Sequence, residues 1–113
     1  MNEEPTMAAW DQVRSREAAE ALRRQGALEP VLLVPAELGG EAVAANVVLV
    51  PPETRRAKEA TTAELLDVFR GGRADQLSVT PDYRGDSFVP AALTVTAWRE
   101  GSAPAYERRI DVW

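Results

Sequence analysis

The chain contains no cysteine and no histidine. These absences exclude disulfide bonds, thiolate nucleophiles, zinc sites built on Cys or His, and imidazole as a base near neutral pH. The four serines lie outside any Gly-x-Ser-x-Gly sequence and have no histidine to activate them. Because an Asp-x-Asp-x-Asp-Gly run for calcium is absent as well, the sequence predicts neither a bound metal nor a cofactor.

Lysine is scarce, because Lys58 is the only one among the 13 Lys and Arg residues. This preference for arginine, together with abundant alanine, is typical of a GC-rich bacterial genome. Lys58 could in principle form an imine or act as a base. It stands beside Glu59 on an amphipathic helix, however, so we predict a solvated surface residue.

Long hydrophobic runs are also missing, since no window approaches the roughly 20 apolar residues of a membrane helix. Glu3 and Glu4 stand where a signal peptide would carry positive charge, so we expect a cytoplasmic protein. The net charge is −5, and the basic residues are spread along the chain next to acids. Nucleic acid and anionic membranes are therefore not expected partners.

What is present is the balance of an ordinary globular protein: 113 residues, 45% apolar and 27% charged. We predict a single α+β domain over residues 1–113. A first helix is expected over residues 7 to 25, with Thr6 as its N-cap and Gly26 as its stop. Short strands are expected at 31–34 and 47–50, with the Gly39-Gly40 turn between them.

A second helix is expected over residues 54 to 70, although Thr61 to Glu64 also spells a capping box that would start it later. Strands at 76–80, 88–99 and 106–113 then form an antiparallel meander. Matching apolar faces in the last pair sets Leu93 opposite Val112 and Val95 opposite Ile110. The predicted fold is one mostly antiparallel sheet of about five strands with two helices, in the order α-β-β-α-β-β-β.

The segment from Pro81 to Pro90 holds the densest cluster of functional groups. Asp82 or Asp86 could serve as general acid or base, with Tyr83 and Arg84 orienting an anionic substrate. The same residue types are common in turns for structural reasons, and we favour that interpretation. No catalytic residue is therefore assigned, and a small carboxylate-based enzyme stays the alternative.

The sequence contains two motifs. The first runs from Leu33 to Pro51 and includes a Gly-Gly turn and an Asn-x-Val-x-Val-Pro strand, and the second is the Tyr-x-Gly-x-Ser-Phe-Val-Pro segment after Asp82. Through these two motifs the chain resembles a group of short uncharacterised bacterial proteins, and the resemblance covers about residues 30 to 113. The resemblance brings no activity or catalytic residue with it. It implies that the two turns are shared architecture.

The leading functional hypothesis is a non-catalytic protein-binding module, by analogy with small acidic antitoxin or immunity proteins. Its expected surface is the outer face of the final hairpin, because Trp and Arg are over-represented among interface hot spots. The residues assigned to this surface are Trp98, Trp113, Thr96, Arg109 and Glu107.

Self-association is also expected, because residues 31–34 and 47–50 are apolar at consecutive positions. Such strands are typical of a sheet that is covered on both faces, and only two helices are available to cover it. A second copy is the most common way to cover a bare apolar face. We therefore predict a homodimer with Val31, Leu33, Val48 or Val50 near the contact.

Overall fold

The computed structural model describes residues 10–113. The molecule is elongated, with extents of 51 × 25 × 22 Å. Its helices and strands are α2 (Arg16–Arg24), β1 (Glu29–Leu32), β2 (Val47–Val50), α3 (Pro52–Arg70), β3 (Gln76–Asp82), β4 (Ala92–Trp98) and β5 (Pro104–Asp111). The α+β class and the element order are confirmed. The single five-stranded sheet is wrong, because the strands form two antiparallel sheets, β1-β2 and β3-β4-β5.

Helix α2 begins later than the sequence suggested. Ser15 has an extended backbone, and its Oγ accepts the Ala18 N–H at 3.0 Å. It is therefore an N-cap and ends any continuous helix through that position. The predicted cap Thr6 lies outside the described residues. Gly26 adopts φ 83°, which confirms the predicted left-handed stop.

Helix α3 begins at Pro52, a position where a missing N–H costs nothing because that group has no partner inside the helix. The alternative start at Thr61 is wrong, since this residue lies fully buried in mid-helix. The buried side of α3 changes character along its length. It is polar in the first half, with Thr54, Lys58 and Thr61, and apolar beyond, with Leu65 and Val68.

The β4-β5 register differs from the prediction by two residues. Leu93 pairs with Ile110, and Val95 pairs with Arg108. A shift of two keeps every side chain on its face, so the apolar pattern could not tell the two registers apart. The length of the hairpin connection sets the register. Strand pairing already starts at Pro104, which we expected to lie in the loop. Val112 and Trp113 then lie past the end of the strand pairing.

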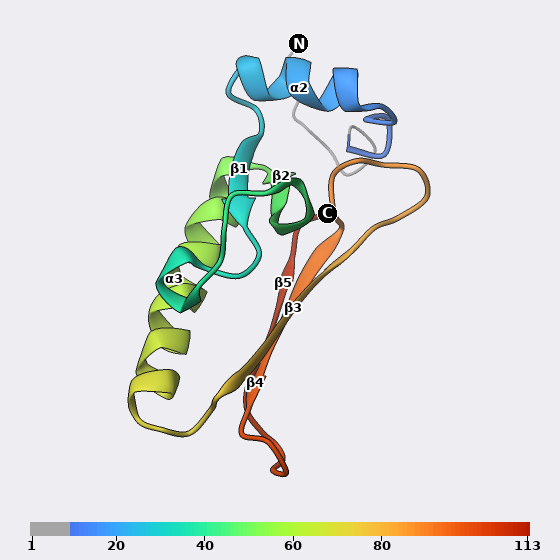
Figure 1. Cartoon of the computed structure of the whole chain (residues 1–113). Coiled ribbons are helices and arrows are strands. Elements are labelled where there is room, and N and C mark those ends of the chain that lie inside the picture. Colours follow the sequence, from blue (N-terminus) through green and yellow to red (C-terminus); the bar gives the residue numbers. More distant parts are fainter. Residues whose placement is uncertain (1–9) are drawn as a thin grey trace.

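The core is a row of three clusters along the molecule. Helix α3 and the β1-β2 pair both lie against the inner face of the three-stranded sheet, and α2 crosses one end (Figure 1). The end cluster under α2 contains Val13, Ala19, Leu28, Val89, Ala91 and Trp113. The middle cluster contains Val31, Leu33, Val48, Val50, Leu93 and Ile110, and the third contains Leu65, Val68, Ala74, Val95 and Ala97.

The middle cluster contains the four apolar residues on which the predicted dimer contact was based. Val31, Leu33, Val48 and Val50 are all buried inside the chain, at 9% exposure or less. The three-stranded sheet supplies the second layer that we expected from another copy. These four residues therefore do not offer a surface for a dimer contact. The homodimer itself stays a prediction.

The Gly-Gly turn has a clear structural cause. Asn46 Oδ1 accepts the Val34 N–H at 2.8 Å, and its Nδ2 donates to the Val34 carbonyl at 3.1 Å. Gly40 passes so close that a Cβ there would lie 1.8 Å from the Val34 oxygen. Glycine and asparagine at these positions therefore build the connection between β1 and β2.

Candidate functional site

The segment Pro81–Pro90, called the Pro81–Pro90 loop below, contains the last two residues of β3 and the connection that follows, and it links distant parts of the chain. The Phe88 N–H donates to the Val13 carbonyl at 2.7 Å. Ser87 Oγ donates to the Trp10 carbonyl at 2.8 Å and accepts the Val89 N–H at 3.0 Å. These bonds hold the segment before α2 against the loop. The hydrogen bonds of Ser87, Phe88 and Val89 therefore stabilise the fold.

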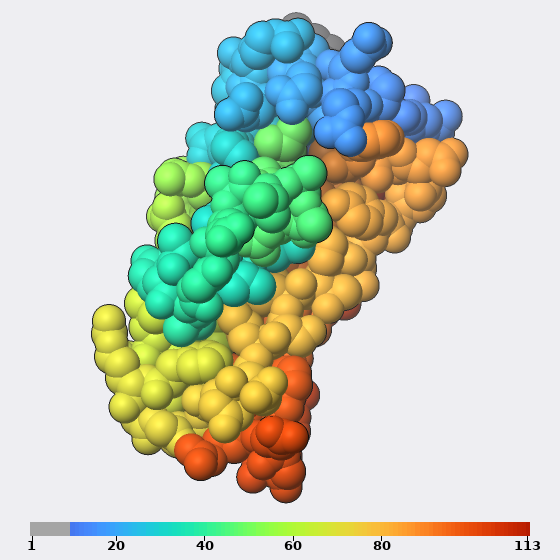
Figure 2. Space-filling model, viewed as in Figure 1, coloured from blue at the N-terminus to red at the C-terminus, as the bar shows by residue number. Residues whose placement is uncertain are grey.

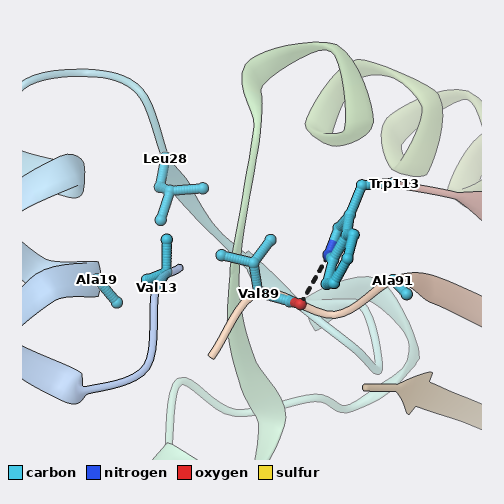
Figure 3. Close-up of a cluster of buried hydrophobic side chains, with 6 residues drawn as sticks. All are labelled: Val13, Ala19, Leu28, Val89, Ala91 and Trp113. Atoms are coloured by element: carbon cyan, nitrogen blue, oxygen red, sulfur yellow. Dashed lines mark hydrogen bonds between the residues drawn. The ribbon is translucent and has the colours of Figure 1, made fainter. Parts of the chain in front are cut away.

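Trp113 lies in the cluster under α2 and is 7% exposed. Its indole N–H donates to the Val89 carbonyl at 3.0 Å, and Figure 3 shows Val89 between this ring and Val13. The Arg84 guanidinium lies 4.7 Å from the centre of the ring and donates to the Trp113 carbonyl at 2.8 Å. Arg84 therefore fixes the position of the C-terminal residue.

The four residues of the enzymatic interpretation do not converge on one cavity. Asp82 is exposed and forms an ion pair with Arg109 at 3.4 Å. Asp86 is exposed, and Arg84 is engaged with Trp113. Tyr83 alone lines a groove, and partial burial raises the pKa of its phenol. Neither Asp82 nor Asp86, the carboxylates of the enzymatic interpretation, lines this groove.

The outer face of the three-stranded sheet brings together four of the five residues assigned to partner binding. Thr96 pairs with Glu107, and Trp98 and Arg109 follow on the same face at alternate positions. The Arg109 guanidinium bonds to Asp111 at 2.9 Å and to Asp82 at 3.4 Å. Trp113 does not share this surface, because it lies beyond the strand and is buried under α2.

A second surface was not apparent from the sequence. A groove of about 380 Å³ lies between α2, β2 and the Pro81–Pro90 loop, on the face where these segments meet in Figure 2. Tyr83 is 49% exposed and Phe88 42% exposed, and both line it. Val43, 51% exposed, adjoins the lining residue Ala44. Within residues 10–113 these three are the large hydrophobic side chains that are exposed, and two of them, Tyr83 and Phe88, line the same groove.

Charged side chains of α2 form one border of this groove. Arg23 pairs with Glu20 at 3.7 Å. Arg16 also lines the groove and makes no ion pair within the described part of the chain. The border therefore carries a net positive charge beside an apolar floor of Val47 and Leu49.

A pocket of about 460 Å³ lies on the other side of β1, between this strand and α3. Its aliphatic walls come from β1 and the following turn, and its polar groups come mostly from α3. The lining residues are Pro30, Val31, Leu32, Pro35, Ala36, Glu37, Arg55, Lys58, Glu59 and Thr62.

Lys58 is the unexpected member of this pocket. The sequence predicts a solvated lysine, but the side chain is only 3% exposed, so that prediction is wrong. Removal of water from the ammonium lowers the pKa of Lys58 below its ordinary 10.5, and the carboxylate of Glu37 opposes this only in part. Helical spacing could have indicated the burial, because Lys58 lies four residues after Thr54 and seven before Leu65 on the buried side.

Comparison with models of protein families, with curated proteins and with solved structures finds no match to this chain. No helix within residues 10–113 has the length and apolar character needed to cross a bilayer. The same residues contain no group of three acidic side chains that could hold a metal ion. The candidate functional surfaces of the described residues are the groove, the outer sheet face and the Lys58 pocket.

Proposed function

We propose that the chain is a protein-binding module that holds a partner in the groove between α2, β2 and the Pro81–Pro90 loop. The observation that carries this proposal is that two exposed aromatic side chains, Tyr83 and Phe88, line the same groove. Contiguous exposed apolar side chains commonly mark interaction sites. Aromatic residues are also enriched among those that carry binding energy.

The groove supports a binding role better than the outer face of the three-stranded sheet does. On that face the single tryptophan, Trp98, is half-buried, and the Arg109 guanidinium is already bonded to Asp82 and Asp111. An antiparallel sheet commonly leaves one face in water, so its exposure calls for no partner. The outer face therefore serves as the comparison surface in the test.

The lining of the groove indicates the chemistry of the partner segment. Apolar side chains of the partner would cover Phe88, Val47 and Leu49, which removes apolar area from water. Arg16 at the border favours an acidic residue beside that apolar stretch, because complementary charge steers and orients binding. We therefore propose an apolar segment with an acidic flank.

Site-specific photo-cross-linking in cells that express the chain tests the proposal. A benzoylphenylalanine in place of Tyr83 is expected to give a discrete cross-linked protein. The same group in place of Thr80, an exposed β3 residue on the outer face opposite Thr94, is not. Phe88→Asp should abolish the cross-link from position 83, because it places a charge on the apolar floor. Thr80→Asp is the matched control and should leave the cross-link unchanged.

Cross-links from position 80 with none from position 83 would move the binding surface to the sheet and contradict the groove. If Thr80→Asp weakens the cross-link from position 83 as strongly as Phe88→Asp does, the groove is contradicted as well. A cross-linked species of twice the 12.3 kDa chain mass identifies a second copy as the occupant. In that case the predicted homodimer forms through the groove.

A further inference from the structure

Lys58 combines three properties that ordinary lysines do not share. Its side chain is 3% exposed, and it lines a pocket of about 460 Å³. Within residues 10–113 no carboxylate lies within 4.0 Å of its amine. It is also the only lysine of the chain, so its amine has no side-chain competitor of the same kind. Buried charges are normally paired, and this one is not.

The neighbouring cation occupies two of the acids that could otherwise pair with Lys58. Arg55 lies in the same pocket and binds Glu59 at 3.2 Å and Glu29 at 3.6 Å. Glu37 is the remaining acid of the pocket and lies beyond ion-pair distance. Burial and the lack of a direct counter-ion raise the neutral, nucleophilic fraction of this amine above that of a solvated lysine.

The walls of the pocket select the kind of molecule that could meet this amine. Pro30, Val31, Leu32, Pro35 and Ala36 give an aliphatic surface next to it. Two carboxylates, Glu37 and Glu59, line the pocket, and the one guanidinium there is already shared between two acids. When the Lys58 amine is neutral, as imine formation requires, the two carboxylates outnumber the one guanidinium, so an anionic ligand would meet excess negative charge, whereas an uncharged molecule would not.

We propose that the pocket binds small uncharged aldehydes or ketones with an aliphatic body, and that the Lys58 amine forms a reversible imine with them. The nitrogen lone pair attacks the carbonyl carbon, and one N–H proton passes to the carbonyl oxygen to give a carbinolamine. The second N–H proton then leaves with that hydroxyl group as water. A C=N bond replaces the C=O bond, so no oxidant or reductant is required. This site shares one lining residue, Pro30, with the proposed protein-binding groove and differs from it in all the others.

Reductive trapping in the full chain tests the proposal, with an internal reference in the same molecule. Arg24 is exposed and forms no ion pair in the described residues, so Arg24→Lys introduces an ordinary solvated lysine far along the sequence. The folded variant is treated at about pH 7 with butanal and sodium cyanoborohydride. Peptide mapping then compares alkylation at the two lysines. We expect Lys58 to be labelled at least about tenfold faster than the introduced lysine.

A second arm tests the ligand class, because glyoxylate offers an aldehyde with a negative charge. We expect glyoxylate to lose the preference for Lys58 that butanal shows. Labelling of Lys58 no faster than the introduced lysine overturns the proposed site. An equal or larger preference with glyoxylate overturns the uncharged class. Phe88→Asp should not change the labelling of Lys58. A negative labelling result therefore contradicts only the Lys58 site, and a negative cross-linking result contradicts only the protein-binding groove.

Discussion

Arg84 and Trp113 are joined twice, once through the face of the indole and once through the backbone. The guanidinium carbon lies 4.7 Å from the ring centre, and a guanidinium N–H donates to the Trp113 carbonyl at 2.8 Å. The indole N–H in turn donates to Val89, in the same loop as Arg84. The Pro81–Pro90 loop therefore holds the C-terminal residue in the end cluster, beneath α2.

This arrangement predicts a large loss of stability when the indole is removed. Trp113→Ala should lower the free energy of unfolding by about 3–5 kcal/mol, because it leaves a cavity among Val13, Leu28 and Val89. Arg84→Ala should cost about 1–2 kcal/mol, since the ring stays buried and only the cation–π contact and one hydrogen bond are lost. Urea denaturation measures both. Equal losses for the two variants would contradict the assigned roles.

A second prediction separates a steric requirement for glycine from a conformational one. Gly40→Ala should cost about 3 kcal/mol or more, because its Cβ would overlap the Val34 carbonyl and the backbone must move. Gly26→Ala meets open space and should cost only about 1–2 kcal/mol for its positive φ. Thermal unfolding of the two variants gives the comparison. A larger cost at Gly26 would show that the Gly40 contact relaxes easily.

Local signals predicted most elements of the fold. The strand before Pro51, the stop at Gly26 and the meander all follow from side-chain pattern and breakers, and the structure contains them. The number of sheets did not follow, because a two-stranded plus a three-stranded antiparallel sheet and a single five-stranded sheet have the same order of strands along the chain. The register of β4 with β5 also stayed open to a shift of two, since both options bury Leu93 and Ile110.

The candidate sites were less predictable because they depend on contacts between distant residues. Pattern alone placed Trp113 on the outer hairpin face, but the chain leaves the sheet before this residue and folds it under α2. Lys58 looks solvated beside Glu59, yet β1 and the turn after it close over its side of α3. The groove combines residues from α2, β2 and the loop before β4, which no local signal joins.

If the groove is a binding surface, its exposed aromatic residue should matter little for folding. Phe88→Ala should change the free energy of unfolding by less than about 1 kcal/mol, because this side chain is already 42% exposed. Val89→Ala, one residue further, should cost about 2 kcal/mol or more, since Val89 is fully buried. Denaturant titration of both variants is the measurement. A Phe88 loss as large as the Val89 loss would make Phe88 part of the core rather than a docking residue.

The last prediction concerns the pH dependence of stability through Lys58. Burial lowers the pKa of this amine in the folded chain below the 10.5 of the unfolded chain. Between these two pKa values the amine is protonated in the unfolded chain and neutral in the folded chain. The free energy of unfolding therefore rises as the pH rises through this range, and it falls as the pH is lowered. Lys58→Met removes this group and keeps an aliphatic side chain. At neutral pH the variant should be more stable than the wild type, by about 1 kcal/mol or more.

The advantage of Lys58→Met should shrink as the pH rises through the lowered pKa of the wild-type amine towards 10, because the amine then loses its buried charge. Glu37, Glu59 and Arg55 face the same pocket in both proteins, so they contribute alike. Tyr83 and Tyr106 have raised pKa values and lower the stability of both proteins only at still higher pH. Urea unfolding of the two proteins across this range decides the matter. Parallel pH profiles would mean that the Lys58 amine keeps its ordinary affinity for protons in the folded chain.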